Sequence, residues 1–407
     1  MSVSRVFFLS LLCLPLPALA QEWPQFRGPG GQGLSQVQAA PLTWSEDSAN
    51  IAWKVPIAGL GWSSPVVADG RIWLTTASED GASLRLISLD LETGRELQNV
   101  EVLHLETVGR IHNKNSHASP TPVLEDDRVY VHFGNYGTAC LTTAGEPVWR
   151  TKIDYPHVHG PGGSPVVYQD VLIIICDGSS EPFVTGLDKR TGEELWRTAR
   201  PENDGKKFAF STPLLIEVDG VPQAVCPGAG GVSSYNPLTG EELWRVDYPG
   251  GYSVTPRPAY GSGLVFVSSG FNRPVLYAIR PTGRGNVSET HVAWTTDRGA
   301  PHSPSPLVVD DALYLVSDRG VAVCLDAKTG EQVWQERVGG NYSASPLLAA
   351  GRIYALSEEG VTTVFAAGKE YKELAVNTLP GRTLATPAPI EGALLLRTDT
   401  HLYRINQ

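Results

Sequence analysis

The sequence predicts an all-β fold, an eight-bladed β-propeller with four-stranded antiparallel blades. Three observations predict it. The heptapeptide TGEELWR occurs at residues 191–197 and again at 239–245, 48 positions later. A small residue, then proline, then a short apolar run occurs eight times along the chain. Glycine (42) and proline (31) are abundant and there are 10 tryptophans, which favours short strands and tight turns over helices.

The eight proline-containing runs mark the first strand of each blade. They are SSPVV (63–67), PTPVL (120–124), GSPVV (163–167), STPLL (211–215), VTPRP (254–258), PSPLV (304–308), ASPLL (344–348) and ATPAP (385–389). Pro65 and Pro387 lie 322 positions apart over seven steps, so the mean period is 46 residues, as in repeat architectures. A first strand would be a sheet edge lining the channel, where proline, which has no N–H to donate, is tolerated.

The remainder of each repeat predicts three further strands. An apolar second strand such as VLIIIC follows a tight turn, and the third strand ends at a Thr-Gly or Ala-Gly turn that suits a positive φ. The fourth strand carries a tryptophan that we expect to dock on the neighbouring blade. These residues are Trp53, Trp149, Trp196, Trp244, Trp294 and Trp334. At about 25 cal/mol per Å² over about 200 Å², each supplies at most roughly 5 kcal/mol of packing.

The last repeat has no room for a fourth strand. It begins near Thr386 and ends with ALLLRTDTHLYRINQ. The segment NIAWKVP at 50–56, which holds Trp53, resembles a fourth strand without a blade of its own. We therefore expect this N-terminal strand to complete the last blade. Residues 50–407 would then form one propeller, preceded by an N-terminal extension at 21–49.

The first twenty residues predict a cleavable secretory signal peptide. A basic residue precedes an apolar run, and Ala18-Leu19-Ala20 forms a cleavage site before Gln21. Leu12 precedes Cys13 where a lipidation site needs a small residue, so cleavage is favoured over a lipid anchor. No other stretch is apolar for 18 residues, which predicts no transmembrane segment. The net charge of −11, with acids and bases interspersed, argues against nucleic acid. We expect a periplasmic or secreted monomer.

Four cysteines remain in the predicted mature chain, at positions 140, 176, 226 and 324. Their spacing matches no zinc or haem motif. Each lies in or at the end of an apolar run, which favours buried free thiols. A disulfide is the alternative, with Cys176 and Cys226 as its best pair.

The repeated motif resembles the tryptophan-docking repeats of pyrroloquinoline-quinone-like propellers. It reads LDLETGREL, LDKRTGEELW, YNPLTGEELW and LDAKTGEQVW across residues 50–407. That group includes the quinoprotein alcohol dehydrogenases and the outer-membrane-assembly propeller lipoprotein family, and the resemblance implies their eight-bladed fold. Dehydrogenases of this kind carry an adjacent cysteine pair, a calcium ligand set and, in some, a C-x-x-C-H haem motif. No adjacent cysteines and no C-x-x-C-H motif occur here, and no calcium ligand set can be placed.

The chemically rich loops all fall on one predicted face of the ring. Loops joining fourth strands to first strands, and second strands to third, share that face and hold seven of the nine histidines. Polar loop residues on one rim of a rigid scaffold are where binding sites usually lie. The predicted channel-mouth site comprises His112, Asn115, His117, His132, Asn135, Tyr136, His157, His159, Asp177, Arg257, Arg319, Asn341, Tyr342 and Arg397.

These residues have structural alternatives. His157 and His159 could bind a metal, but loop histidines more often bond backbone groups, and Asn115 and Asn135 could do the same. The arginines could pair with nearby carboxylates. We expect no metal site, no catalytic residue can be assigned, and no cofactor is expected. The predicted function is a non-catalytic scaffold that binds a ligand or protein partner. The alternative is a metal-dependent oxidoreductase, or one using pyrroloquinoline quinone with calcium, at the channel mouth.

Overall fold

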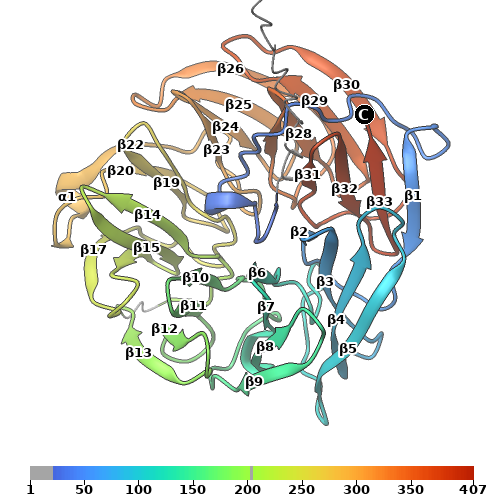
Figure 1. Cartoon of the computed structure of the whole chain (residues 1–407). Helices are drawn as coiled ribbons and strands as arrows, with labels where there is room; N and C mark the ends of the chain where they lie inside the picture. Colours follow the sequence, from blue (N-terminus) through green and yellow to red (C-terminus); the bar gives the residue numbers. More distant parts are fainter. Residues whose placement is uncertain (1–21, 202–204) are drawn as a thin grey trace, which may run out of the picture.

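The computed structural model describes residues 22–201 and 205–407, which form a ring of eight β-sheets around a central channel (Figure 1). The predicted signal peptide lies outside the described residues. In the first seven sheets four antiparallel strands run in chain order from an inner strand at the channel to an outer strand near the perimeter. The structure confirms the predicted all-β, eight-bladed propeller.

The first four blades follow one another along the chain. Blade one holds β2 (Val66–Ala68), β3 (Arg71–Ala77), β4 (Ser83–Asp90) and β5 (Glu96–His104). Blade two holds β6 (Val123–Glu125), β7 (Arg128–His132), β8 (Thr138–Thr142) and β9 (Pro147–Thr151). Blade three holds β10 (Val166–Tyr168), β11 (Val171–Cys176), β12 (Phe183–Asp188) and β13 (Glu194–Ala199). Blade four holds β14 (Leu214–Val218), β15 (Val221–Gly228), β16 (Gly231–Tyr235) and β17 (Glu242–Asp247).

The last four blades close the ring. Blade five holds β18 (Ala259–Gly261), β19 (Leu264–Ser268), β20 (Leu276–Ile279) and β22 (Val292–Thr296). Blade six holds β23 (Leu307–Val309), β24 (Ala312–Val316), β25 (Val321–Asp326) and β26 (Gln332–Arg337). Blade seven holds β27 (Leu347–Ala349), β28 (Arg352–Leu356), β29 (Val361–Ala366) and β30 (Glu373–Thr378). Blade eight holds β31 (Ala388–Ile390), β32 (Ala393–Arg397), β33 (His401–Asn406) and, at its outer edge, β1 (Ile51–Pro56), which pairs antiparallel with β33.

Blade four differs from the expected four strands by one addition. The two-residue strand β21 (Gly285–Asn286) pairs in parallel with β17 at the perimeter of the ring. It leads into α1 (Ser288–His291), which Figure 1 shows at the outer edge of the ring. The remaining helical turns are the short 3-10 elements η1 (Pro29–Gly31) and η2 (Gly134–Tyr136).

Most of the predicted tryptophans dock on the turn of the following blade. Their indole N–H groups donate to a backbone carbonyl at 2.9–3.2 Å in the pairs Trp53–Leu91, Trp149–Lys189, Trp294–Ala327 and Trp334–Gly368. Trp196 packs on Gly240 of the next turn, and Trp244 donates instead to Gln223 of its own blade. The repeated tryptophan therefore joins neighbouring blades as well as filling their interface.

The backbone conformation and a close tryptophan ring both require glycine in the repeated turn. Gly192 has φ +76°, and a Cβ placed on it would lie 2.6 Å from the ring of Trp149. Gly240 and Gly330 stand in the same relation to Trp196 and Trp294. Any side chain there would meet both the left-handed backbone and the indole. The TG-to-W spacing thus encodes a contact between two successive repeats.

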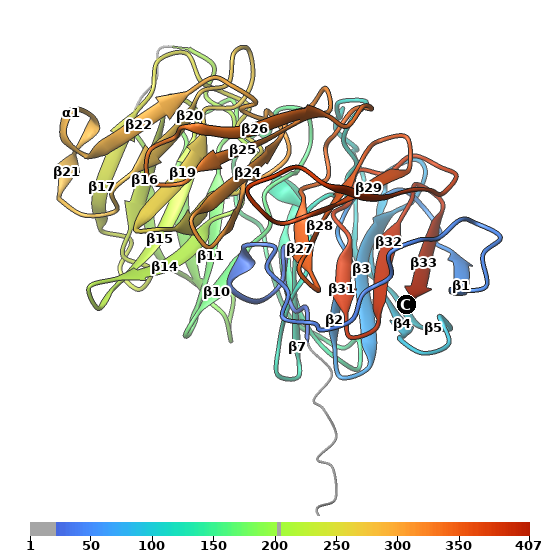
Figure 2. The same cartoon turned by 90° about the horizontal axis from the view of Figure 1, so that it is seen from above.

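The segment at residues 22–35, here called the plug segment, crosses the channel. Figure 1 shows its turn η1 at the centre of the ring, and Figure 2 shows it beside the inner strands β10 and β27. Trp23 exchanges both backbone hydrogen bonds with Val67 of β2 at 2.9 Å. Further hydrogen bonds join the plug segment to blades two, five, six and seven through Leu124, Tyr260, Pro306 and Leu348. An N-terminal extension was expected at residues 21–49, but its path across the channel was not predicted from the sequence.

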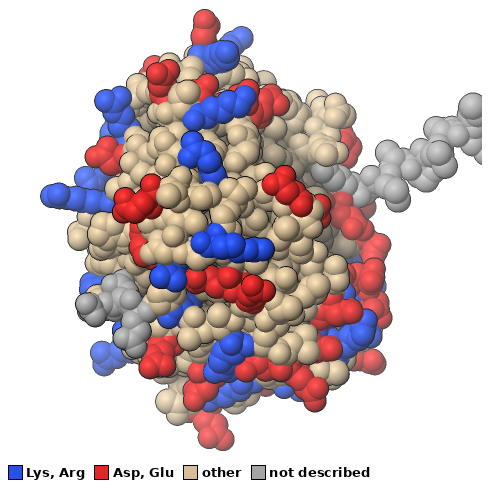
Figure 3. All heavy atoms as spheres, turned by 90° about the vertical axis from the view of Figure 1, so that its left-hand side faces the viewer, with Lys and Arg blue, Asp and Glu red and all other residues tan. Residues whose placement is uncertain are grey.

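The four cysteines at 140, 176, 226 and 324 are free and buried, so the alternative disulfide between Cys176 and Cys226 is not formed. No helix within residues 22–201 or 205–407 is long and apolar enough to cross a membrane. On the side of the ring that carries α1 and β17, basic and acidic side chains alternate over the surface (Figure 3).

Candidate functional site

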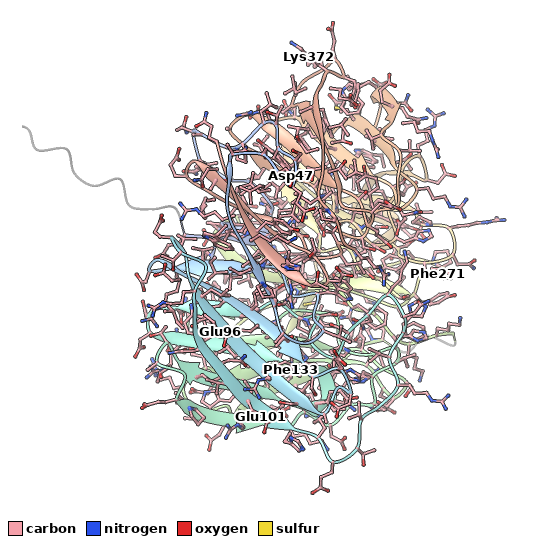
Figure 4. All side chains as sticks on the ribbon, turned by 90° about the vertical axis from the view of Figure 1, so that its right-hand side faces the viewer. Asp47, Glu96, Glu101, Phe133, Phe271 and Lys372 are labelled. Atoms are coloured by element: carbon pink, nitrogen blue, oxygen red, sulfur yellow. The ribbon has the colours of Figure 1, made fainter. Side chains whose placement is uncertain are left out.

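A cavity of about 1290 Å³ occupies the channel on the side of the chemically rich loops. Its lining comes from the residues that precede the inner strands, from the rim loops above them, and from Phe26 of the plug segment. Phe271 lies on this rim, at one end of the ring axis in Figure 4, whereas Glu96 and Glu101 lie on the outer strand β5. The plug segment, which crosses the channel, therefore borders this cavity through Phe26.

A ring of serine and threonine hydroxyls surrounds the channel at the start of the inner strands. This hydroxyl ring comprises Ser64, Thr121, Ser164, Thr212, Ser305, Ser345 and Thr386. The backbone N–H of one member donates to the hydroxyl of the member in the next blade, at 2.9–3.1 Å. One series of these bonds runs from Ser64 through Thr121 and Ser164 to Thr212, and a second runs from Ser305 through Ser345 and Thr386 back to Ser64. The small residue before proline in the repeat therefore links the blades at the channel wall.

Arg257 replaces the hydroxyl in blade five. In that blade Pro258, and not Pro256, directly precedes the inner strand. The residue equivalent to the hydroxyl-bearing residues of the other blades is therefore Arg257. The backbone N–H of Arg257 still donates to Ser305, at 3.0 Å. Its guanidinium donates to the carbonyls of Phe26 (2.6 Å) and Pro213 (3.0 Å). Arg257, which stands where the other blades have a hydroxyl residue, thus holds the plug segment.

Five of the predicted site residues line the cavity, namely His112, Asn115, His159, Arg319 and Asn341. Asn115 has the structural role considered as its alternative, because its amide donates to the carbonyls of His159 (2.8 Å) and Pro161 (2.9 Å). It joins the loop before blade two to the loop before blade three. Lys114, beside it, reaches Glu358 of blade seven at 2.7 Å.

Four further predicted residues lie in these loops but outside the cavity lining: His117, Asn135, Tyr136 and His157. The Tyr136 hydroxyl accepts the N–H of Gly109 at 3.0 Å, and a ring nitrogen of His117 lies 3.0 Å from the Gly109 carbonyl. Burial lowers the pKa of His157 to about 4, so this imidazole is neutral at pH 7. Tyr136 and His117 therefore fix the loop through Gly109 rather than face the cavity.

His132 is buried beneath the rim. Its ring nitrogens lie 2.8 Å from the Thr138 hydroxyl and 3.2 Å from the Tyr155 hydroxyl. Burial lowers its pKa to about 3, which keeps the ring neutral at pH 7. This histidine is a satisfied core side chain, and it does not line the cavity together with His159.

Asp177 forms a buried ion pair with Arg200. The Arg200 Nε lies 3.7 Å from Asp177 Oδ1, and both side chains are almost fully buried. Neither carboxylate oxygen has a hydrogen bond from the described residues. Burial raises the pKa of Asp177 to about 6, against the opposing effect of the Arg200 cation. A cavity of about 10 Å³, the size of one water, borders Asp177 and His157.

The other three predicted residues, Arg257, Tyr342 and Arg397, are buried and do not line the cavity. The Arg397 guanidinium donates to Ser63 and to the carbonyl of Thr75 at 2.7–3.1 Å. Neither Arg257 nor Arg397 pairs with a described carboxylate, contrary to the alternative considered for them, and burial lowers the pKa of each to about 9. Arg257 lies just before an apolar strand and Arg397 lies at the end of one. The packing of neighbouring blades therefore buries both arginines instead of leaving them at the channel mouth.

An arc of aromatic rings along the cavity wall was missed in the sequence. Successive ring centroids lie 5.2–5.7 Å apart, and the arc runs through His112, His159, Phe208, Tyr252, Phe271 and His302. All six rings line the cavity. Each successive rim loop carries an aromatic residue or a histidine in the sequence. Because these loops differ in length, the ring residues have no regular spacing from which the arc could be predicted.

The described residues contain no cluster of three or more His, Cys, Asp or Glu side chains that could hold a metal ion. His157 and His159 do not act as a pair, since His159 lines the cavity while His157 packs against Tyr136 at a centroid distance of 5.1 Å. Among the described residues, therefore, no group of acidic side chains is gathered as a carboxylate-rich calcium site would need.

The family model for outer membrane protein assembly factor BamB matches residues 36–180, 105–305 and 286–371. The chain belongs to this BamB family. BamB of Burkholderia pseudomallei is 32% identical over 114 residues. That match covers 28% of this chain and 29% of the relative, so the chain matches less than a third of the relative's length.

Solved structures similar to this BamB-family chain share its fold at low identity. BamB from Moraxella catarrhalis superposes with a TM-score of 0.61 at 15% identity, over 87% of this chain and 98% of the other. Quinohemoprotein alcohol dehydrogenase from Comamonas testosteroni gives 0.64 at 12% identity, over 95% and 80%. The computationally designed Ika8 protein gives 0.60 at 11% identity, over 86% and 100%. One architecture thus accommodates an assembly factor, a dehydrogenase and a designed chain, so the site must carry the functional argument.

Proposed function

We propose that this BamB-family propeller is an exported, non-catalytic scaffold that binds a protein partner at the rim of its channel. The supporting observation is the preformed cavity of about 1290 Å³, whose rim loops are fixed to one another by side-chain bonds. Binding loops held by a rigid ring lose little conformational entropy when they bind. Membership of a family described as an assembly factor supports a protein partner.

Export is tested on the mature chain. Expressed with its own N-terminus in a Gram-negative host, the protein is expected in the periplasmic or secreted fraction with Gln21 as its first residue. Intact mass and N-terminal peptide analysis measure this. A control in which Ala18 and Ala20 are replaced by glutamate is expected to retain the full-length mass. Full-length wild-type chain in the cytoplasm would refute the export proposal.

Partner binding is tested by site-specific photo-crosslinking in the native host. A photoreactive amino acid at Phe271, half exposed on the rim, is expected to give a discrete covalent adduct with a partner protein. The same amino acid at Lys372, placed away from the rim in Figure 4, serves as the matched control. Adducts at both positions, or at neither, would remove the support for a rim-binding scaffold.

The oxidoreductase alternative is tested on the same protein. Purified chain is titrated with pyrroloquinoline quinone and Ca²⁺, and untreated protein is submitted to metal analysis. Stoichiometric quinone binding with alcohol oxidation, or a stoichiometric bound transition metal, would overturn the non-catalytic proposal.

A further inference from the structure

The deep part of the cavity carries hydroxyl donors that the protein does not use. In five members of the hydroxyl ring the oxygen accepts a backbone N–H, and the hydroxyl proton has no acceptor among the described residues. These members are Ser64, Thr121, Ser164, Thr212 and Thr386. All five line the cavity and are at most 4% exposed. Because these hydroxyls face the cavity, their protons are available to a bound molecule, and the ring suits a ligand rich in acceptor oxygens.

The cavity is basic within an acidic chain. Its lining holds five lysines and arginines but only two carboxylates, whereas the chain has 32 basic and 43 acidic residues. Four of the cations, Lys206, Arg273, Arg319 and Arg337, form no ion pair with any described residue. Lys114 is neutralised by Glu358, and the carboxylate of Asp318 accepts the N–H of His302 at 2.6 Å. The remaining cations therefore attract an anionic ligand.

The aromatic arc gives the same cavity an apolar wall. The rings from His112 to His302 present faces and edges along one side, and Phe271 is 50% exposed. Aromatic faces are electron-rich and attract the polarised C–H groups of a sugar ring. A wall of rings beside cations and hydroxyl donors matches a ligand that combines C–H faces with oxyanions.

A polysaccharide satisfies these features better than an acidic peptide does. A peptide would bind most readily by adding a strand to an inner-strand edge. The plug segment already forms backbone hydrogen bonds with three of these inner strands, at Val67, Leu124 and Leu348. The volume also exceeds the 300–1,000 Å³ or so that a single small ligand fills, so it accommodates several linked units.

We propose that the cavity binds a segment of an acidic polysaccharide, with its carboxylate or sulfate groups held by the rim arginines and the hydroxyl ring and its sugar rings packed on the aromatic arc. The proposal goes beyond the proposed function, because it assigns the cavity a polysaccharide ligand in addition to the protein partner at the rim. It requires no covalent step.

Calorimetric titration of the full mature chain tests this inference. The probes are a hexamer of galacturonate, a sulfated chondroitin hexasaccharide, neutral maltohexaose and a hexaglutamate peptide, each at low and high salt. At least one acidic hexasaccharide is expected to bind at least tenfold more tightly than maltohexaose, and to weaken as salt rises. Comparison of the first two probes shows whether carboxylate or sulfate is preferred.

Variants on exposed positions keep the fold intact. Binding of the acidic sugar is expected to fall at least tenfold in Arg319→Ala/Arg337→Ala and in Phe271→Ala. Arg284→Ala is the matched control, because Arg284 is also exposed and without a described ion pair but lies at the outer edge beside α1, and it is expected to bind as wild type. Equal binding by wild type and the double variant would overturn the proposal.

The remaining outcomes separate the two proposals. Tighter binding of hexaglutamate than of both acidic sugars would replace the glycan with an acidic peptide. Absence of sugar binding together with a specific crosslink at Phe271 would refute the ligand assignment and leave the scaffold function in place. Absence of both would refute both.

Discussion

Replacing Gly192 with alanine is expected to lower the free energy of unfolding by about 2–4 kcal/mol. About 1 kcal/mol or more comes from forcing a Cβ into the left-handed region at φ +76°. The remainder is over-packing, because that Cβ would lie 2.6 Å from the Trp149 ring, and inserted methyl groups in tight contacts cost roughly 1–3 kcal/mol. Urea unfolding followed by tryptophan fluorescence measures the loss.

Gly220 supplies the matched control for this prediction. It has nearly the same backbone, φ +75°, but no atom within 4 Å of an added Cβ. Gly220→Ala should therefore show the backbone cost alone, about 1–2 kcal/mol. Equal losses in the two variants would show that the contact between the turn and the tryptophan does not stabilise the ring.

Replacing Arg200 with methionine is expected to destabilise the protein by about 3–5 kcal/mol at pH 8, because it leaves the buried carboxylate of Asp177 without a cation. The double variant Asp177→Asn/Arg200→Met removes the uncompensated charge and is expected to recover part of that loss. Chemical denaturation of both variants measures the difference. If the double variant were less stable than the single one, the ion pair would not be the cause.

The same pair predicts a pH dependence with a definite sign. Burial raises the pKa of Asp177 to about 6 in the folded protein, from about 3.9 in the unfolded chain. The folded state therefore holds this proton more tightly, and the associated stability is fully present below pH 4 and is lost as the pH rises through 6. Without Arg200 the pKa rises further, so the deficit of Arg200→Met should be small at pH 4.5 and large at pH 8. A deficit that grows on acidification would contradict this assignment.

Much of the fold could be predicted because every blade of a propeller repeats the same short sequence features. The proline before each inner strand and the Thr-Gly turn before each tryptophan recur at a regular period, and each has a local physical reason. The position of Trp53 outside any repeat indicated that an early strand belongs to the last blade, where β1 pairs with β33. What repetition does not encode, such as the path of the plug segment across the channel, could not be predicted.

The candidate site was predicted less well for the same reason. Loop histidines indicated the correct region, but a sequence does not show whether a loop side chain points into the channel or into the core. His132 and Asp177 follow apolar strands directly and are buried with them. Arg257 did not stand out in the sequence, because Thr255 before Pro256 continues the series of hydroxyls before proline, and only the structure shows that Pro258 precedes the inner strand. The aromatic arc depends on how loops of different blades approach one another, which only the closed ring reveals.

The crossing of the channel by residues 22–35 has a consequence for the order of assembly. These residues leave the ribosome early, yet Arg27 finds its acceptor on Pro306, 279 positions later, and Ser35 bonds to Leu348. The partners in blades six and seven, and β33 as the partner of β1, are absent until the final blades have been synthesised. Such distant pairings are slow to form. The opening stretch can pair early with Val67 and Leu124, whereas its bonds to Pro306 and Leu348 form only when blades six and seven are present, and these late bonds lock a nearly finished ring from within.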